Sequence, residues 1–383
     1  MRSAGDVWND SVLWLVRGVF SVMARRFPLP SGAGHPVNSI VIFSTAGIGD
    51  TLSDTPAIRA VRESYPASRI TAVVHHRRRE VLADNPHLDA LVSHRKGVLG
   101  FFRTLRAIRQ ARPDVVIVLR ANDPDIWPLA YLSGAQSLVG RPANTQFSFL
   151  INRPVPVPEW EQTHGVEQTL AIVREIGAET ADPRMVFQVS AAARRRIQEH
   201  LKAWNLDGAS LVAMQVHASP RLAFRDWPAE SLVKLGRAIL REYPVRLILT
   251  GGREDQAKAA AIQQALGPGA RCVAGTLRLS ETAALLERCG ALLTTDTGIM
   301  HLGFAVRVPT LALLHPYNAH RVGPHGYGSL HRVVLLPSSL WQGDDPPRVG
   351  MDRLSPEEVI RVFREFWREA EAQPGKGDPR THG

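Results

Sequence analysis

The sequence has few cysteines, no long uncharged apolar run and no excess of acidic residues. Cys272 and Cys289 are its only cysteines among 383 residues, which excludes a disulfide scaffold and favours a reducing compartment such as the cytoplasm. No stretch approaches the roughly 18 apolar residues that span a bilayer. The nearest, Ser11–Ala24, is interrupted by Arg17. Acidic residues near the N-terminus stand where a secretion signal needs positive charge, so the sequence predicts a cytoplasmic protein.

Acidic side chains are outnumbered, because 46 Lys and Arg against 36 Asp and Glu give a net charge of +10. This excess favours anionic partners: nucleotides, phosphorylated saccharides, nucleic acid or an anionic membrane. Nucleic acid is disfavoured, since the basic cluster His75–Arg79 contains no Phe, Tyr or Trp for base stacking. The histidines show no metal-ligand spacing, and no nucleophile elbow occurs. We therefore expect no metal site and no cofactor.

Residues 1–36 form a predicted amphipathic extension. Apolar residues recur at helical spacing, namely Trp8, Val12, Leu15, Val19 and Met23. Arginines stand at positions 17, 25 and 26. The pattern fits a helix lying on the anionic inner-membrane surface, and equally a helix packed on its own domain or on a second subunit.

The basic cluster His75–Arg79 also has two interpretations. It suits a site for the phosphates of an acceptor or a lipid, and it suits a solvated loop.

From Ser39 onward, short β-branched runs alternate with helix-length segments. The predicted strands are Ile40–Phe43, Ile70–Val74, Val115–Leu119, Leu211–Val216, Val245–Leu249, Ala291–Thr294 and Thr310–Leu314. This alternation predicts an α/β fold with two doubly wound, Rossmann-like domains facing across a cleft. The expected parts are an acceptor-side domain over 37–185, a nucleotide-sugar domain over 186–350, a helix over 351–372 and a flexible tail over 373–383.

A glycine-rich turn, Gly47-Ile48-Gly49-Asp50-Thr51, follows the first predicted strand. Such turns usually bind phosphate at a helix N-terminus, but this one lacks both the G-x-G-x-x-G pattern and the Walker lysine. What it offers is the carboxylate of Asp50 beside backbone that a ligand can approach closely. Asp50 suits a general base that deprotonates an acceptor hydroxyl, and it also suits a helix cap.

A second polar segment, Thr294–Leu302, follows a predicted strand and opens a helix. Thr297 and Gly298 would present free amides at the positive end of that helix, which suits a pyrophosphate. Asp296 can accept hydrogen bonds from sugar hydroxyls, and His301 lies one turn into the helix. The alternatives are an N-cap role for Asp296 and a buried core position for His301.

These two segments together resemble the signature motifs of glycosyltransferase family 9, the bacterial heptosyltransferases. Gly47–Asp50 with Thr55–Ala60 is similar to the opening motif, and Asp296–Leu302 to the second, written D-[ST]-G-x-x-H-L. The resemblance runs from about Ser39 to Pro316. It implies a GT-B fold, inversion of the anomeric configuration of the transferred sugar, and no requirement for metal.

The resemblance also implies a role for each matching residue. Asp50 would be the general base, with Gly47, Gly49 and Thr51 on the acceptor side. Arg225 would stabilise the leaving nucleoside diphosphate, although it also suits a surface ion pair. The remaining donor-binding residues would be Ser219 in a phosphate loop, Glu254 on the ribose, Leu277 near the base, and Asp296, Thr297, Gly298 and His301 on the sugar and phosphates.

The sequence thus predicts an inverting, metal-independent glycosyltransferase that moves a heptose or related sugar from an ADP-sugar to a lipopolysaccharide-core-like acceptor, lipid-linked or phosphorylated. The alternatives are another nucleotide sugar for a different envelope glycan, and a non-catalytic nucleotide-binding scaffold. The scaffold is disfavoured because it would need none of Asp50, Arg225 and Asp296.

One segment, Asp123-Pro124-Asp125, departs from the family pattern. It looks like the D-x-D metal motif of another glycosyltransferase fold, or like ordinary helix capping.

Overall fold

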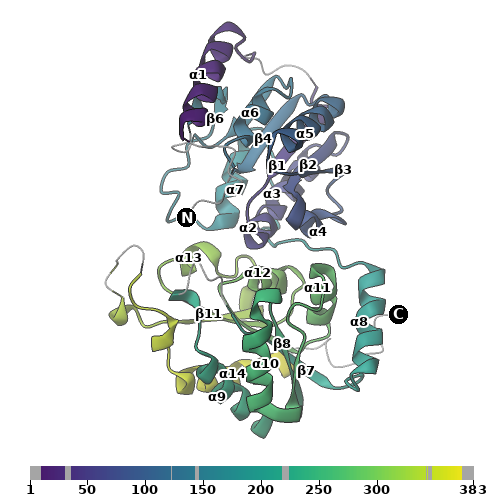
Figure 1. Cartoon of the computed structure of the whole chain (residues 1–383), viewed down its shortest axis with the longest axis vertical. Helices are drawn as coiled ribbons and strands as arrows, with labels where there is room; N and C mark the ends of the chain where they lie inside the picture. The colour runs from purple at the N-terminus through teal and green to yellow at the C-terminus, as the bar shows by residue number, and fades with distance from the viewer. Residues whose placement is uncertain are drawn as a thin grey trace. The chain divides into compact units, whose positions relative to one another are not determined.

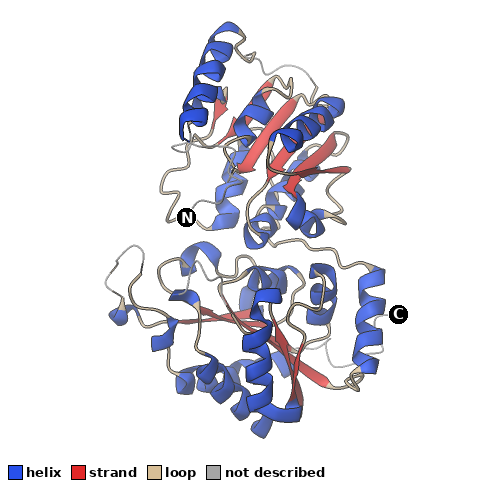
Figure 2. Cartoon of the chain, in the orientation of Figure 1, coloured by secondary structure: helices blue, strands red, loops and turns tan. Residues whose placement is uncertain are grey.

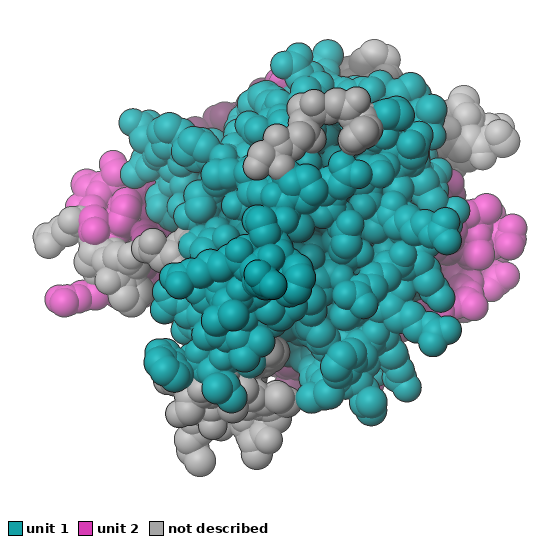
Figure 3. Space-filling view, turned by 90° about the horizontal axis from the view of Figure 1, so that it is seen from above, with its two compact units in different colours: residues 1–183 teal, residues 184–383 magenta. Residues whose placement is uncertain are grey.

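The computed structural model describes residues 10–30, 36–121, 123–142, 146–217, 224–341, 343 and 347–372. The chain divides into two compact units, Met1–Pro183 and Arg184–Gly383, which are coloured separately in Figure 3. The sequence placed this boundary between residues 185 and 186. Ser219 of the predicted phosphate loop and the predicted tail over 373–383 lie outside the described residues.

In unit 1, the described residues form one parallel sheet of six strands, in the order β3-β2-β1-β4-β5-β6 (Figures 1 and 2). The strands are β1 Ser39–Ser44, β2 Arg69–His75, β3 Ala90–His94, β4 Val115–Arg120, β5 Ser137–Gly140 and β6 Arg153–Pro154. Ile40 of β1 pairs with Ile70 of β2 on one side and with Val115 of β4 on the other. The central strands are buried along nearly their whole length, which is why they read as continuous apolar runs.

Helices cover both faces of this sheet (Figure 2). They are α1 Asp10–Arg26, α2 Ile48–Ser53, α3 Thr55–Ser64, α4 Arg79–Leu82, α5 Val98–Ala111, α6 Ile126–Tyr131 and α7 Gly165–Arg174. α1, α5 and α6 share one core layer, in which Phe20, Ile108 and Trp127 pack over Val41 and Val116. α3 and α7 pack against each other in a separate layer.

In unit 2, the described residues form a second parallel six-stranded sheet, in the order β12-β11-β10-β7-β8-β9. Its strands are β7 Ser210–Gln215, β8 Val245–Thr250, β9 Ala270–Cys272, β10 Ala291–Thr295, β11 Thr310–Leu314 and β12 His331–Leu335. Its helices are α8 Ala191–Ala203, α9 Ala229–Glu242, α10 Gln256–Leu266, α11 Leu279–Glu287, α12 Gly298–Ala305, α13 Ala319–Val322 and α14 Pro356–Ala372. α14 belongs to the core of this unit, where Val359, Phe363 and Trp367 are buried.

Both sheets have the same topology. Counted within each unit, the strands run in the order third, second, first, fourth, fifth, sixth. The direction of winding reverses between the first and fourth strands, which are β1 and β4 in unit 1 and β7 and β10 in unit 2. In open α/β sheets, ligands bind outside the carboxyl ends of the strands at this switch point. The predicted fold of two doubly wound sheets is thereby confirmed.

Candidate active site

Asp50 lies in the first turn of α2, just beyond the carboxyl end of β1. Its Oδ2 accepts a hydrogen bond from the Gly47 amide at 3.1 Å, and its Oδ1 lies 3.9 Å from the Arg120 guanidinium. The side chain remains 49% exposed. A Cβ on Gly47 would come within 3.1 Å of the carboxylate, so a larger residue there would displace Asp50 slightly. Asp50 therefore does cap the turn, yet it still offers a carboxylate to a ligand.

A buried ion pair that the sequence did not reveal lies beside Asp50. The carboxylate of Asp54 accepts hydrogen bonds from Ser44 Oγ at 2.6 Å and from Arg120 Nε at 2.8 Å. Arg120 also donates to the Gly165 carbonyl. Burial raises the pKa of Asp54 to about 6, although the positive charge of Arg120 opposes the rise. The guanidinium at the end of β4 is thus fixed next to Asp50 at the switch point.

The other residues of the first turn make local contacts. The Thr51 side chain is buried, and its Oγ1 donates to the Gly47 carbonyl at 2.8 Å. The Gly49 carbonyl accepts a hydrogen bond from Ser53 Oγ at 3.0 Å. These bonds fix the turn that carries Asp50. The contacts of Gly47, Gly49 and Thr51 with an acceptor stay predictions.

In unit 2, Asp296 stands at the carboxyl end of β10 and is buried. Its Oδ2 lies 2.7 Å from the Arg225 guanidinium and accepts a hydrogen bond from Asn318 Nδ2 at 2.5 Å. The N-cap of α12 is Thr297, so the capping interpretation of Asp296 is wrong. The surface interpretation of Arg225 is wrong too, because only 19% of its side chain is exposed.

α12 starts directly after this ion pair. The Thr297 hydroxyl caps the helix by accepting from the Met300 amide at 3.4 Å. The amides of Gly298 and Ile299 lie in the first turn, where the helix dipole favours an anion. His301 is buried on the same helix, with its ring edge-on to Phe304. The burial of His301 agrees with the core interpretation, and its contact with the donor stays a prediction.

One predicted donor residue, Leu277, lines a pocket of about 650 Å³ beyond the carboxyl ends of β8 and β9. Its lining includes Gly252, Leu277 and the basic side chains of Arg196 and His200. Gly275 closes the pocket in a backbone conformation with φ +67°, and a Cβ there would lie 2.7 Å from Arg253 Cα. Glu254, predicted to hold the ribose, is exposed on the short helical turn Arg253–Asp255 and is absent from the described lining.

A charged network links the Arg225 segment to α10. Asp226 Oδ2 lies 2.7 Å from Lys258 Nζ and 3.0 Å from His217 Nδ1. Lys258 stands one turn beyond Glu254, and His217 follows β7. Sequence reasoning missed Lys258 because a single lysine on a polar helix carries no signal. It missed Asn318 because the contact with Asp296 depends on how the segment after β11 folds.

The basic cluster His75–Arg79 continues from the end of β2. Burial, together with the nearby Arg78, lowers the pKa of His75 to about 4. Burial and the charge of Arg95 also lower the pKa of His76. Both imidazoles are therefore neutral at pH 7, and the arginines carry the positive charge of the cluster.

The D-x-D segment lies in the loop between β4 and α6. Asp125 occupies the N-cap position of α6, but its side chain makes no capping hydrogen bond, so the capping interpretation is wrong. Its Oδ2 instead lies 3.3 Å from His94 Nε2. Asp123 Oδ1 lies 2.6 Å from Lys96 Nζ. These four side chains belong to unit 1 and are considered separately below.

One face of α1 packs on unit 1 and the opposite face is exposed. Phe20 is buried, with its ring edge-on to Tyr131 and Phe147 at 6.0 Å. Four apolar side chains are more than half exposed on the helix: Trp14, Leu15, Val19 and Val22. The inner face thus packs on its own domain, as one interpretation expected. Within the described residues, no helix is long and apolar enough to cross a membrane.

The chain matches the model of glycosyltransferase family 9 (heptosyltransferase) over residues 102–339. It is 22% identical over 280 residues to lipopolysaccharide heptosyltransferase 3 of Escherichia coli, covering 69% of this chain and 80% of that protein. It resembles the solved glycosyl transferase family 9 protein of Veillonella parvula, with TM-score 0.76 and 22% identity over 89% of this chain and 98% of that one. The structure of E. coli ADP-heptose LPS heptosyltransferase II gives TM-score 0.72 and 18% identity, over 87% and 100%. The predicted GT-B fold and glycosyltransferase activity are confirmed, and the chain belongs to glycosyltransferase family 9, the heptosyltransferases.

Proposed function

We propose that this glycosyltransferase moves a heptose, or a related sugar, from an ADP-sugar to a hydroxyl of a lipopolysaccharide-core-like acceptor. The transfer inverts the anomeric configuration and uses no metal ion. The observation that carries the proposal is the buried Arg225–Asp296 pair beside the N-terminus of α12, at the switch point of unit 2. A cation, a carboxylate and helix amides are the groups that a diphosphate-linked sugar needs.

On the donor side, Arg225 and the first-turn amides of α12 bind the diphosphate, and Asp296 accepts hydrogen bonds from sugar hydroxyls. Negative charge grows on the nucleoside diphosphate as the glycosidic bond breaks. The fixed guanidinium of Arg225 stabilises that charge, which is the task that a metal ion performs in other transferases. The pocket between Gly252 and Leu277 takes the nucleoside. Glu254 contacts the ribose from the adjacent turn Arg253–Asp255, outside the described lining. Adenine is supported by the name of the E. coli structural neighbour, which includes ADP-heptose.

On the acceptor side, Asp50 takes the proton of the attacking hydroxyl. The oxygen attacks the anomeric carbon from the face opposite the diphosphate, so the configuration inverts. The Gly47 amide and the Arg120 guanidinium orient the carboxylate, and its half-exposed position leaves room for the acceptor. General-base catalysis of this kind contributes roughly 10²–10⁴-fold in rate.

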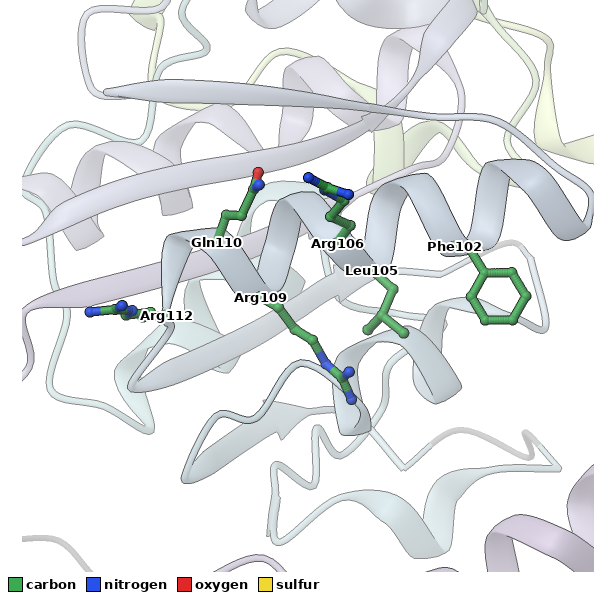
Figure 4. A pocket seen from close by; sticks show the side chains of 6 residues that line it. All are labelled: Phe102, Leu105, Arg106, Arg109, Gln110 and Arg112. Carbon is green, nitrogen blue, oxygen red and sulfur yellow. The ribbon is translucent and has the colours of Figure 1, made fainter.

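We also propose that the exposed face of α1 contacts an anionic membrane in which a lipid-linked acceptor resides. Trp14 is 75% exposed, and Arg17, Arg25 and Arg26 are exposed on the same helix. α5, in the same layer, adds an exposed Phe102 and several exposed arginines. They are Arg103, Arg106 and Arg109, with Arg112 just after the helix, and the last three line a pocket of about 680 Å³ (Figure 4). Apolar anchors with arginines suit the boundary between lipid headgroups and acyl chains.

A thermal-shift panel of ADP-, UDP-, GDP- and CMP-sugars tests the donor. Stabilisation follows occupancy, so an ADP-sugar should raise the melting temperature more than the other donors at equal concentration. Arg225→Ala should lose this response, whereas Arg241→Ala, a change to an exposed arginine on α9, should keep it. A selective response to a different base would favour another nucleotide sugar. Stabilisation by heparin alone would contradict the proposal.

A further inference from the structure

Outside the proposed site, unit 1 buries a cluster of one imidazole and two carboxylates. His94 ends β3, and Asp123 and Asp125 lie in the loop between β4 and α6. The three residues are 0%, 7% and 2% exposed, in that order. One ligand atom from each lies within 4.8 Å of the other two. Among the residues that the structure describes, this is the one such group of three.

Two buried atoms in this cluster have no hydrogen-bond partner. They are His94 Nε2 and Asp125 Oδ1. His94 Nε2 faces Asp125 Oδ2 at 3.3 Å, but the geometry is not that of a hydrogen bond. A carboxylate oxygen buried without a donor is costly, because its lost hydration is not replaced. The unpaired Asp125 oxygen therefore favours a cation beside it.

The surroundings of the cluster suit a cation. The other imidazole nitrogen, His94 Nδ1, lies 3.1 Å from Thr104 Oγ1, which is buried on α5. Histidine ligands of metals commonly hold their second nitrogen in such a hydrogen bond. Lys96 Nζ lies 2.6 Å from Asp123 Oδ1, but its side chain is 61% exposed. Because the Lys96 ammonium is mostly exposed, it can move from Asp123 into water when a divalent ion binds.

We propose that His94, Asp123 and Asp125 bind one divalent first-row metal ion of the Mn²⁺ to Zn²⁺ class. A mixed set of one imidazole nitrogen and two carboxylates suits these ions better than Ca²⁺ or Cu⁺. Ligand atoms at roughly 2.0–2.2 Å from one ion are at most about 4.4 Å apart, so the three side chains need only a small closing movement. The bound ion ties the β4–α6 loop to β3. The site is independent of the proposed transfer, whose leaving group is assigned to unit 2.

Equilibrium dialysis of the full-length protein, stripped by chelator and free of any metal-binding tag, tests the site. Dialysis against Mn²⁺ or Zn²⁺, followed by elemental analysis, should give about one ion per chain and a higher melting temperature. Asp125→Asn should lose the ion. Asp226→Asn, which alters the His–Asp pair of unit 2, should retain it. A folded Asp125→Asn protein that binds as much metal as the wild type would overturn the proposal.

Lys96→Met gives a second test that does not depend on a buried substitution. Removing the competing ammonium should tighten metal binding about two- to fivefold, the equivalent of an exposed ion pair of roughly 0.4–1 kcal/mol. Circular dichroism checks that the variant is folded. Failure of both the wild type and this variant to bind Mn²⁺ and Zn²⁺ would overturn the proposal.

Discussion

Asp50 and Arg225 differ in how firmly the protein holds them. Asp50 is half exposed and receives one backbone hydrogen bond. Arg225 is mostly buried and pairs with a carboxylate at 2.7 Å. Substitution of Asp50 should therefore spare the fold, whereas loss of Arg225 leaves the buried Asp296 without its cation.

Asp50→Asn should lower kcat by roughly 10²–10⁴-fold, because the amide cannot accept the acceptor proton. Calorimetric titration should show unchanged affinity for the ADP-sugar, since the donor is assigned to unit 2. Asp84→Asn is a matched control, because Asp84 is an exposed carboxylate of the same unit. Full activity of Asp50→Asn would rule out the general-base role.

Arg225→Ala should weaken ADP binding by roughly 10–100-fold, the value of one charge-assisted hydrogen bond. Turnover should fall as well and stay low in excess Mg²⁺, because the proposed mechanism uses the guanidinium in place of a metal. Calorimetry with ADP and steady-state kinetics measure both effects. Recovery of activity by a divalent ion would instead indicate a metal-assisted reaction at the diphosphate.

Asp54 gives a pH dependence of stability with a definite sign. Its pKa is about 6 in the folded protein against the ordinary 3.8, because burial outweighs the opposing charge of Arg120. The folded state thus binds more protons than the unfolded state between these values. Protonation of Asp54 therefore adds to the free energy of unfolding, and this contribution is complete below pH 3.8. It is lost as the pH rises through 6, and the loss is at most about 3 kcal/mol.

Asp54→Asn should remove this decrease of the free energy of unfolding between pH 4 and pH 7. Urea unfolding between pH 4 and pH 7 measures it, with wild type and variant compared at each pH. An unchanged slope in the variant would assign the pH dependence to other groups.

At the scale of elements, strand bounds were predicted best where the pattern of apolar residues was strong. The bounds of β11, Thr310–Leu314, agree residue by residue with expectation. β3 and β9 were missed because a short edge strand is only partly buried and shows no continuous apolar run. The clusters around Asp54 and His94 could not be predicted, because they join residues that are close only after the sheet has formed.

The exposed face of α1 should bind anionic vesicles. Replacing Leu15, Val19 and Val22 by Gln should abolish sedimentation with such vesicles while leaving activity on a soluble, delipidated acceptor unchanged. Sedimentation of the wild type should fall as salt rises, since the exposed arginines contribute by electrostatic attraction. Vesicle binding that survives the triple substitution would exclude this face as the contact.

Phe20→Ala is the control for the opposite face of α1. It should destabilise unit 1 by about 3 kcal/mol, because Phe20 packs between Tyr131 and Phe147. Its vesicle binding should persist wherever the variant is folded.

At the scale of the whole molecule, each unit places a carboxylate of the proposed site at its own switch point, Asp50 in unit 1 and Asp296 in unit 2. Hydrogen exchange with and without ADP should show protection in unit 2, over the segments 250–256, 275–281 and 296–300. These segments contain the pocket lining and the start of α12. Peptides of unit 1 serve as the internal control. Protection confined to unit 1 would contradict the assignment of the nucleotide to unit 2.

The chain passes from unit 1 to unit 2 once, between Pro183 and Arg184, and α14 remains within the core of unit 2. If unit 1 binds the acceptor and unit 2 the donor, as proposed, each function is encoded in its own half of the gene. Under that proposal, mutations before codon 184 should alter the choice of acceptor, and mutations after it the choice of donor. One recombination event at this joint would combine the acceptor preference of one family member with the donor preference of another, without cutting through either hydrophobic core. A lineage could diversify its surface glycans by exchanging halves as well as by point mutation.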